Sequence, residues 1–207
     1  MQQLRIRRAM DAIERHTCVR FSPLSAQATF LSVLSNQEHL CWSSHGFPQK
    51  KKSITTLDAR GCFLHGTLVH ELLHAIGLLH MHQRSDRNDH VHIYKENIKR
   101  DEIMSFVRLY SETYGLPYDL SSVMHYRNQT SYTSKTAFTM LPRGPGGKNM
   151  GQRVDLSPGD VAWVNRMYGC SCHYLGDDLP GATPYESWLS ATTIKSHHLA
   201  PIDASKC

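Results

Sequence analysis

The 207-residue sequence has no long hydrophobic run and no internal repeat. No apolar stretch approaches the roughly 20 residues that a helix needs to cross a bilayer, so we expect no transmembrane segment. Nothing recurs at a period of about 20–50 residues, which excludes solenoids and propellers. The 13 Gly, 9 Pro and 40% hydrophobic residues exclude collagen-like and extensively disordered chains. The composition fits one globular domain or a small two-lobed unit.

Clusters of one charge are also scarce. The formal net charge is +5, and the only run of like charges is Lys50, Lys51 and Lys52. A solvated loop explains this run better than a nucleic-acid-binding surface does. We therefore expect no nucleic-acid partner.

The N-terminus lacks the apolar stretch of a secretory signal peptide. The six cysteines, however, include no repeated C-x-x-C pair, and they favour disulfides over a zinc ribbon. Disulfides imply an oxidising, extracellular location. Because the cysteines and the N-terminus disagree, we expect the sequence to begin downstream of the natural start of the protein.

Hydrophobic periodicity predicts four helices and several short strands. The strongest helical pattern covers residues 65–80. Further helices are expected at residues 5–17 and 97–110 and after the start signal Ser157-Pro158. The β-favouring segments are residues 18–21, 29–34, 40–42 and 53–57. Residues 115–159 should be mostly loop, and the residues after Cys172 a polar, weakly structured tail.

The strongest helix carries the sequence HELLH at residues 70–74. Two histidines four residues apart lie on one face of an α-helix, so His70 and His74 can bind one ion. Glu71 can then reach a metal-bound water and remove its proton without being a ligand. A core helix that carries two histidines by chance is the alternative interpretation.

An extension of this motif favours the metal site. Gly77 and His80 complete the pattern H-E-x-x-H-x-x-G-x-x-H. A glycine there can end the helix in a left-handed conformation, so that His80 supplies a third nitrogen ligand. Three histidines plus water form a catalytic zinc site, and the metzincin metalloproteases carry this pattern. We therefore expect one Zn²⁺ per subunit.

Metzincins also have a later tight turn that contains methionine. The sequence SVMHY at residues 122–126 is a candidate for this Met-turn, with Met124 as its methionine. Core packing is the alternative role of Met124, and both roles can hold together because a Met-turn is the hydrophobic floor under the ligands.

These residues resemble one family in particular, the astacins. The resemblance covers roughly residues 1–170 and rests on several stretches besides the zinc motif. They are Gly61-Cys62, His65-Gly66-Thr67, Arg84-Ser85-Asp86-Arg87, the turn at residues 122–126, Leu156-Ser157 with Asp160, and Asn165, Tyr168 and Cys170.

The resemblance implies an α+β, metzincin or zincin-like domain of two lobes. The upper lobe would hold a twisted, mostly parallel sheet and the active-site helix. The lower lobe would be rich in loops and contain the Met-turn and a C-terminal helix. Residues 1–172 would form this catalytic domain, and residues 173–207 a polar tail.

The resemblance also implies roles for individual residues. His70, His74 and His80 would bind zinc, and Glu71 would be the general base. Tyr126 would be an additional zinc ligand that swings away and stabilises the oxyanion; a tyrosine merely buried beside the turn is the alternative. Arg153 would line the primed-side pocket and favour acidic residues, or else be a solvated surface residue.

The family's disulfides would be Cys18–Cys170 and Cys41–Cys62. Cys172 and Cys207 remain, and they can pair with each other, pair between molecules or stay free. Asn128 begins the sequon Asn-Gln-Thr, which is a glycosylation site if the protein is secreted.

Two departures from the family pattern stand out. Astacins usually have Glu after the third zinc histidine, linked through water to the amino terminus that propeptide removal frees. Met81 occupies this position, so we expect that contact to be absent or different. The family's domain also begins with a strand before the first helix, which the sequence lacks along with a propeptide. We expect lower stability than that of a full family domain, or an incomplete gene model.

The leading hypothesis is a secreted zinc endopeptidase, made as a zymogen and acting as a monomer on proteins or peptides. The alternative is a non-catalytic, zinc-binding astacin-like protein, motivated by Met81 and the missing strand. The retained Glu71 argues against it. A purely structural zinc site would need a fourth protein ligand. The zinc motif is followed by a polar loop with three further histidines, which we expect to be solvated or structural: His82, His90 and His92.

Overall fold

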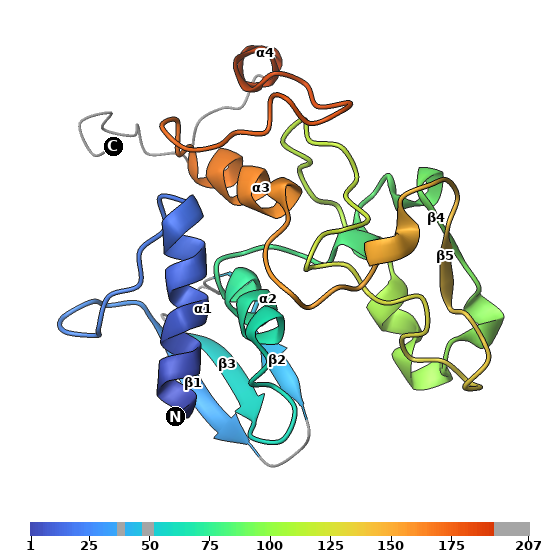
Figure 1. Ribbon diagram of the computed structural model, residues 1–207, viewed down its shortest axis with the longest axis horizontal. Helices are drawn as coiled ribbons and strands as arrows, with labels where there is room; N and C mark the ends of the chain where they lie inside the picture. The colour runs from blue at the N-terminus through green and yellow to red at the C-terminus, as the bar shows by residue number, and fades with distance from the viewer. Residues whose placement is uncertain (37–39, 47–51, 193–207) are drawn as a thin grey trace.

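The computed structural model describes residues 1–36, 40–46 and 52–192. It has an N-terminal half with a sheet and two helices, and a C-terminal half built mostly of loops (Figure 1). The α-helices are α1 (Gln2–His16), α2 (His65–Ala75), α3 (Pro158–Tyr168) and α4 (Tyr185–Ala191), and the strands are β1 (Phe30–Asn36), β2 (Cys41–Ser43), β3 (Lys52–Asp58), β4 (Val91–Ile93) and β5 (Met140–Pro142).

The N-terminal half is a three-stranded sheet of order β1-β3-β2. β1 and β3 are parallel over seven residue pairs, and β2 pairs antiparallel to β3 over three. Strand β3 buries alternate residues, as expected when one face of a sheet packs on helices. The core beneath it joins β3 to α1 and α2 through Leu57, Ile13 and Leu72. This mixed helix-and-sheet arrangement confirms the α+β fold class.

The C-terminal half is ordered around the start of α3. Ser157 caps this helix, and Asp160 completes a capping box by accepting from the Ser157 backbone N–H. The Asp160 carboxylate also accepts from the Ser122 hydroxyl at 2.6 Å and from the Val123 N–H at 2.8 Å. One buried carboxylate therefore holds the turn at residues 122–126 against α3.

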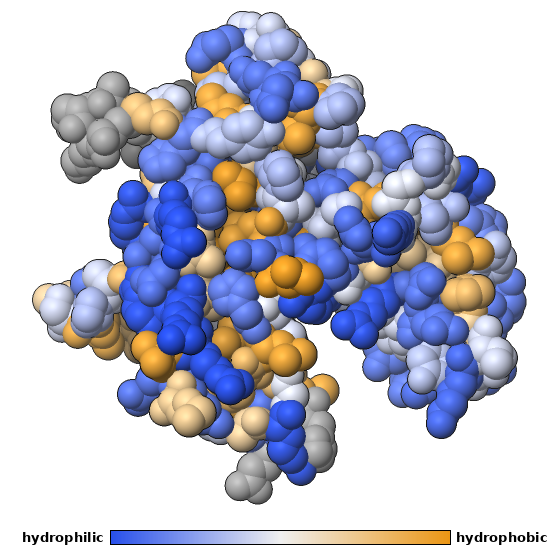
Figure 2. Space-filling view, viewed as in Figure 1, coloured by the Kyte–Doolittle hydropathy of each residue, from blue (hydrophilic) through white to orange (hydrophobic). Residues whose placement is uncertain are grey.

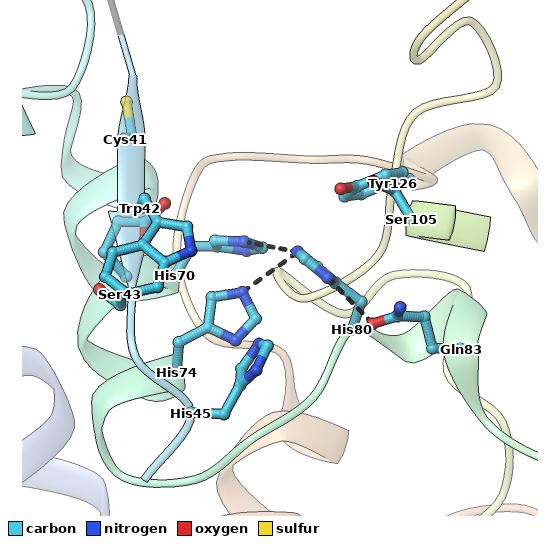
Figure 3. Close-up of a pocket in the computed structure, with 11 residues that line it drawn as sticks. Cys41, Trp42, Ser43, His45, His70, His74, His80, Gln83, Ser105 and Tyr126 are labelled. Carbon is cyan, nitrogen blue, oxygen red and sulfur yellow. Dashed lines mark hydrogen bonds between the residues drawn. The ribbon is translucent and has the colours of Figure 1, made fainter. Parts of the chain in front are cut away.

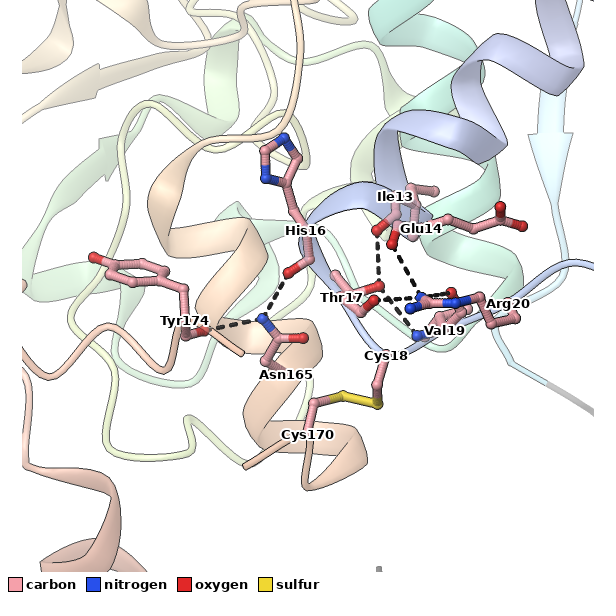
Figure 4. The surroundings of a disulfide bond; sticks show 10 residues. All are labelled: Ile13, Glu14, His16, Thr17, Cys18, Val19, Arg20, Asn165, Cys170 and Tyr174. Atoms are coloured by element: carbon pink, nitrogen blue, oxygen red, sulfur yellow. Dashed lines mark hydrogen bonds between the residues drawn. A yellow bond between two sulfur atoms is a disulfide. The ribbon is translucent and has the colours of Figure 1, made fainter. Parts of the chain in front are cut away.

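Two disulfides join segments that are distant in the sequence. Cys18–Cys170 links the end of α1 to the end of α3, and Asn165 supports this junction by donating to the carbonyls of His16 and Tyr174 (Figure 4). Cys41–Cys62 ties β2 to the turn before α2. The expected pairing of Cys172 with Cys207 lies outside the described residues, because Cys207 is not described.

The prediction of an α-helix at residues 97–110 is wrong. Its centre is a 3₁₀ segment, Arg100–Phe106, in which only Phe106 is buried. Met104 is 72% and Tyr110 92% exposed. Helical stability comes mainly from burying a continuous apolar stripe, and the exposure of Met104, Val107 and Tyr110 interrupts the stripe here.

The strand expected at residues 18–21 is also wrong. Its backbone N–H groups bond to side chains in place of a neighbouring strand: that of Val19 donates to the Thr17 hydroxyl and that of Phe21 to the Glu14 carboxylate. Side-chain acceptors of this kind compete with regular pairing.

The expectation of a weakly structured tail is wrong for residues 173–192. This segment contains α4, and its Tyr185 and Trp188 are buried. The guanidinium of Arg166, itself fully buried, donates to the carbonyls of Leu175, Tyr114 and Thr183. The sequence pattern missed this order because it depends on polar contacts with distant backbone.

Hydrophobic residues gather between α2 and α3 on the face shown in Figure 2, whereas mainly hydrophilic residues cover the part that holds β4 and β5. None of the helices in the described ranges is long and apolar enough to cross a membrane.

Gly66 in α2 offers a test of this contact between halves. A Cβ on Gly66 would lie 2.1 Å from the Arg153 carbonyl carbon, whereas one on Gly61 meets nothing within 4 Å. We predict that Gly66→Ala lowers the free energy of unfolding by about 3 kcal/mol, although alanine favours helices. Thermal unfolding should show a fall of several degrees for Gly66→Ala and almost none for Gly61→Ala. Equal stability of the two variants would contradict the close contact.

Candidate metal centre and active site

Three histidines converge at the C-terminal end of α2. His70 and His74 lie one turn apart on this helix, which ends at Ala75 and not at residue 80 as the pattern suggested. Gly77, at φ +110°, turns the chain back. His80 then points at the helix, with its Nε2 3.1 Å from His74 Nε2 and 3.2 Å from His70 Nε2 (Figure 3).

The hydrogen bonds on the far side of each ring fix where the protons are. His70 Nδ1 lies 2.8 Å from the Val123 carbonyl, and His74 Nδ1 lies 2.7 Å from that of Leu78. His80 Nδ1 lies 3.2 Å from Gln83 Oε1. Oxygens of this kind only accept, so each Nδ1 carries the proton and each neutral Nε2 presents a lone pair. Three lone pairs that face one point fit a cation.

Burial keeps these rings neutral and ready to bind metal. Loss of solvent lowers the pKa of His70, His74 and His80 well below the ordinary value of 6.5, and their mutual proximity lowers it further. Among the described residues this is the one group of three such side chains whose ligand atoms lie within 4.8 Å of one another. The donor set, three imidazoles, suits zinc.

Glu71 lies beside the triad with its carboxylate in the same cavity. Its side chain is buried, with 5% of the residue exposed, and burial raises its pKa to about 7 against the opposing effects of Ser43 and Arg153. Its Oε2 atom has no hydrogen-bond partner within the described protein. A carboxylate with one free oxygen and a pKa near neutrality can take up and release a proton.

Tyr126 lines a cavity of about 340 Å³, on the side opposite Trp42 and Ser43 (Figure 3). Its hydroxyl points into the cavity (Figure 3). The ring stacks on His82 at 3.9 Å between centroids and lies 4.6 Å from the His80 ring. Strand β2 contributes Trp42 and Ser43 to the wall near Glu71. The cavity thus combines a metal-type donor set, a carboxylate and a phenol.

The model of the family "Astacin (Peptidase family M12A)" matches residues 1–169. The chain belongs to the astacin family. It is 39% identical over 167 residues to the astacin-like metalloendopeptidase of Gallus gallus, covering 80% of this chain and 40% of that protein. It is 31% identical over 207 residues to zinc metalloproteinase nas-6 of Caenorhabditis elegans, covering 95% of this chain and 54% of that protein.

A solved structure agrees with this assignment. High choriolytic enzyme 1, a hatching enzyme zinc-protease from Oryzias latipes, superimposes with a TM-score of 0.77 at 31% identity, over 82% of this chain and 83% of that one. The chain spans about half the length of the two curated relatives: 40% of the Gallus gallus protein and 54% of nas-6.

The turn expected from the astacin pattern lies directly under the triad. Met124 is 1% exposed and packs in the same core cluster as Leu72 and Leu73, so the structure gives it a packing role, and its role as the floor under the ligands stays a prediction. The Met81 N–H donates to the Met124 carbonyl at 3.1 Å. Met81 itself is buried in an apolar cluster with Leu116 and Trp163, which accommodates the departure from the family's Glu.

Arg153 and Asn128 lie outside the triad. Arg153 is partly buried, and its Nη1 donates to the carbonyls of Val123 and His125, so it is more than a solvated surface residue. Asn128 lies in the loop before β5, where its carbonyl accepts from Thr139 and Met140. Its role as a glycosylation site stays a prediction.

Sequence reasoning missed four residues in or near the site. His82 and His125 are both fully buried, although His82 was expected in a polar loop, and Tyr118 bonds to His125 at 2.8 Å. His45 follows β2 and lies 4.6 Å from the His74 ring. No periodicity marks such residues, because contacts like those of His45 with His74 and of His82 with Ser105 join different segments. The one sequence signal for any of these residues was the SVMHY turn, because it places His125 next to Tyr126.

The raised pKa of Glu71 predicts a pH effect on the metal-free protein. The folded state holds the proton to about pH 7 and the unfolded state only to about 4.5, so unfolding releases a proton between these values. Glu71 therefore lowers the free energy of unfolding as pH rises through this window, by about 3 kcal/mol.

We expect chelator-treated Glu71→Gln to be more stable than the wild type at about pH 8 and equal to it at about pH 4. Denaturant unfolding at both pH values measures this, and the histidines contribute equally to both proteins. The exposed Glu186→Gln serves as the matched control and should follow the wild type. A constant difference at both pH values would contradict the raised pKa.

Proposed function

We propose that this chain is a zinc-dependent endopeptidase that hydrolyses peptide bonds of proteins. The observation that carries the proposal is the convergence of three neutral imidazole lone pairs beside an unpartnered, buried carboxylate oxygen. His70, His74 and His80 would hold one Zn²⁺, and bound zinc would lower the pKa of a coordinated water to about 7.

Glu71 performs the proton transfers. Its carboxylate faces the cavity beside the triad and accepts the proton of the attacking water. A carboxylic acid whose pKa burial has raised then delivers this proton to the leaving amine. Arg153 contributes an opposing charge effect that keeps a fraction of the carboxylate ionised near neutral pH.

Tyr126 donates a hydrogen bond to the oxyanion of the tetrahedral intermediate. Burial raises the pKa of its phenol above the ordinary 10, so the hydroxyl keeps its proton at neutral pH. Its position across the cavity from Glu71 separates the donor from the base. Donors aimed at developing charge in a site that excludes water are among the largest contributions to catalysis.

The substrate binds as an extended strand along β2. This strand is at one edge of the described three-stranded sheet and lines the cavity. Main-chain hydrogen bonds to an edge strand hold peptides with little regard to sequence, and pockets select side chains. Trp42, 53% exposed on β2, offers an apolar surface beside the scissile bond. Protein or peptide substrates follow from this geometry.

The remaining attributes extend the proposal. The two disulfides Cys18–Cys170 and Cys41–Cys62 support an extracellular protein, in which Asn128 would be glycosylated. We further propose synthesis as a zymogen, action as a monomer, and a catalytic domain of residues 1–172. The non-catalytic alternative gains no support from the described residues, because Glu71 is retained and Met81 is packed in the core.

Metal content and cleavage of an unfolded protein test the proposal together. The oxidised wild type should bind one zinc and lose its peptidase activity with a chelator. Glu71→Gln should keep the zinc and lose at least about 100-fold in kcat/KM, because a general base contributes this much. Glu186→Gln controls for the loss of a carboxylate. Unchanged hydrolysis by Glu71→Gln, or zinc binding without cleavage by the wild type, would contradict the proposal.

Tyr126→Phe tests the oxyanion role separately. Removal of one donor to the oxyanion should lower kcat by about 100-fold with KM nearly unchanged. Steady-state kinetics on a short peptide separates the two constants. A rise in KM at constant kcat would show that Tyr126 only binds substrate.

A further inference from the structure

His125 lies between Tyr118 and Tyr126 and is fully buried. Its Nδ1 is 2.7 Å from the Tyr126 carbonyl, and its Nε2 is 2.8 Å from the Tyr118 hydroxyl. A carbonyl oxygen accepts only, so Nδ1–H donates to Tyr126. Nε2 of the neutral ring is then an acceptor, and the Tyr118 O–H donates to it. A two-bond chain therefore runs from the Tyr118 side chain to the Tyr126 backbone.

Tyr118 is itself firmly held. Its ring stacks face to face on His90, with 4.6 Å between centroids and 8° between planes. The Arg84 guanidinium lies 5.5 Å from the centroid of the same ring. Arg84 also donates to the carbonyls of Leu116 and Pro117, the two residues before Tyr118. Tyr118, which donates the first hydrogen bond, is thus fixed both by its ring and by its backbone.

Tyr126 lies at the other end of this pair of hydrogen bonds, and its hydroxyl is the group that takes part in the proposed reaction. Its hydroxyl faces the histidine triad, while its ring is in contact with His82 and Phe106. The stacked contact with His82 resists tilting of the ring more than sliding in its plane. The hydrogen bond from His125 to the Tyr126 carbonyl holds the backbone from which the ring extends. A shift of about 1 Å at a catalytic group is costly to rate.

We propose that Tyr118 and His125 are positioning residues that hold the Tyr126 hydroxyl against the reacting carbonyl. The inference rests on the proposed function, because it assigns them an effect on the reaction through Tyr126. Neither side chain lines the cavity, so both act on substrate only through their neighbour.

A double-mutant cycle between Tyr118 and Tyr126 tests the proposal. Tyr118→Phe removes one oxygen, keeps the stacked ring and leaves His125 Nε2 without its donor. We expect kcat to fall by about threefold to tenfold with KM nearly unchanged, the range for loss of one buried hydrogen bond. In the Tyr126→Phe background the same change should alter kcat by less than about twofold, because no phenol remains to be positioned.

Tyr114→Phe is the matched control, since Tyr114 lies on the same loop and its ring packs on Trp188. It should leave kcat unchanged in both backgrounds. Equal losses from Tyr118→Phe in the two backgrounds would show a general structural effect and overturn the proposal. No loss in either background would overturn it as well.

A measurement independent of activity separates this inference from the proposed function. In protein labelled with ¹⁵N-histidine, wild-type His125 should show one neutral tautomer with its proton on Nδ1, and Tyr118→Phe should disturb it. His125→Asn identifies the resonance. An inactive wild type that still shows the fixed tautomer would contradict the peptidase proposal alone. A tautomer that Tyr118→Phe leaves unchanged would overturn the positioning role.

Discussion

The structure of the site depends on three hydrogen bonds that point away from it. Each bond places a proton on Nδ1 of one histidine, and so turns a lone pair on Nε2 toward a common point. The acceptors are the carbonyls of Val123 and Leu78 and the side chain of Gln83, which belong to three segments. A cation relieves the resulting repulsion between lone pairs. Without these acceptors the same three histidines would be free to turn away from one another.

The C-terminal half of the chain holds one of those acceptors in place. Val123 receives the His70 bond at its carbonyl, and its N–H is fixed by the Asp160 carboxylate at the start of α3. Arg153 donates to the same carbonyl. Helix α3 is in turn tied to α1 by the Cys18–Cys170 disulfide. The loop-rich half is therefore rigid where the site needs rigidity, despite its little regular structure.

The two walls of the cavity divide the chemistry between the halves. Glu71 and the edge strand β2 come from the sheet-containing half, and Tyr126 comes from the loop-rich half. A base and an oxyanion donor on opposite walls leave room for a peptide between them. Residues 174–188 extend this arrangement, because the Thr183 carbonyl accepts from Arg166 on α3 and Trp188 packs on Tyr114, in the loop that carries Tyr118. These residues follow the stretch that the astacin family model matches, residues 1–169.

The sequence by itself determined the residues that act and their local arrangement. The helical spacing of His70 and His74, the helix-ending Gly77 and the capping signal at Ser157 each follow from backbone rules that operate within a few residues. Tertiary structure alone decided what surrounds them. The order of residues 173–192, the irregular backbone at residues 97–110 and the burial of His82 depend on partners far along the chain. Local patterns carry no trace of such partners, because hydrogen bonds and packing between distant segments leave no periodicity in the sequence.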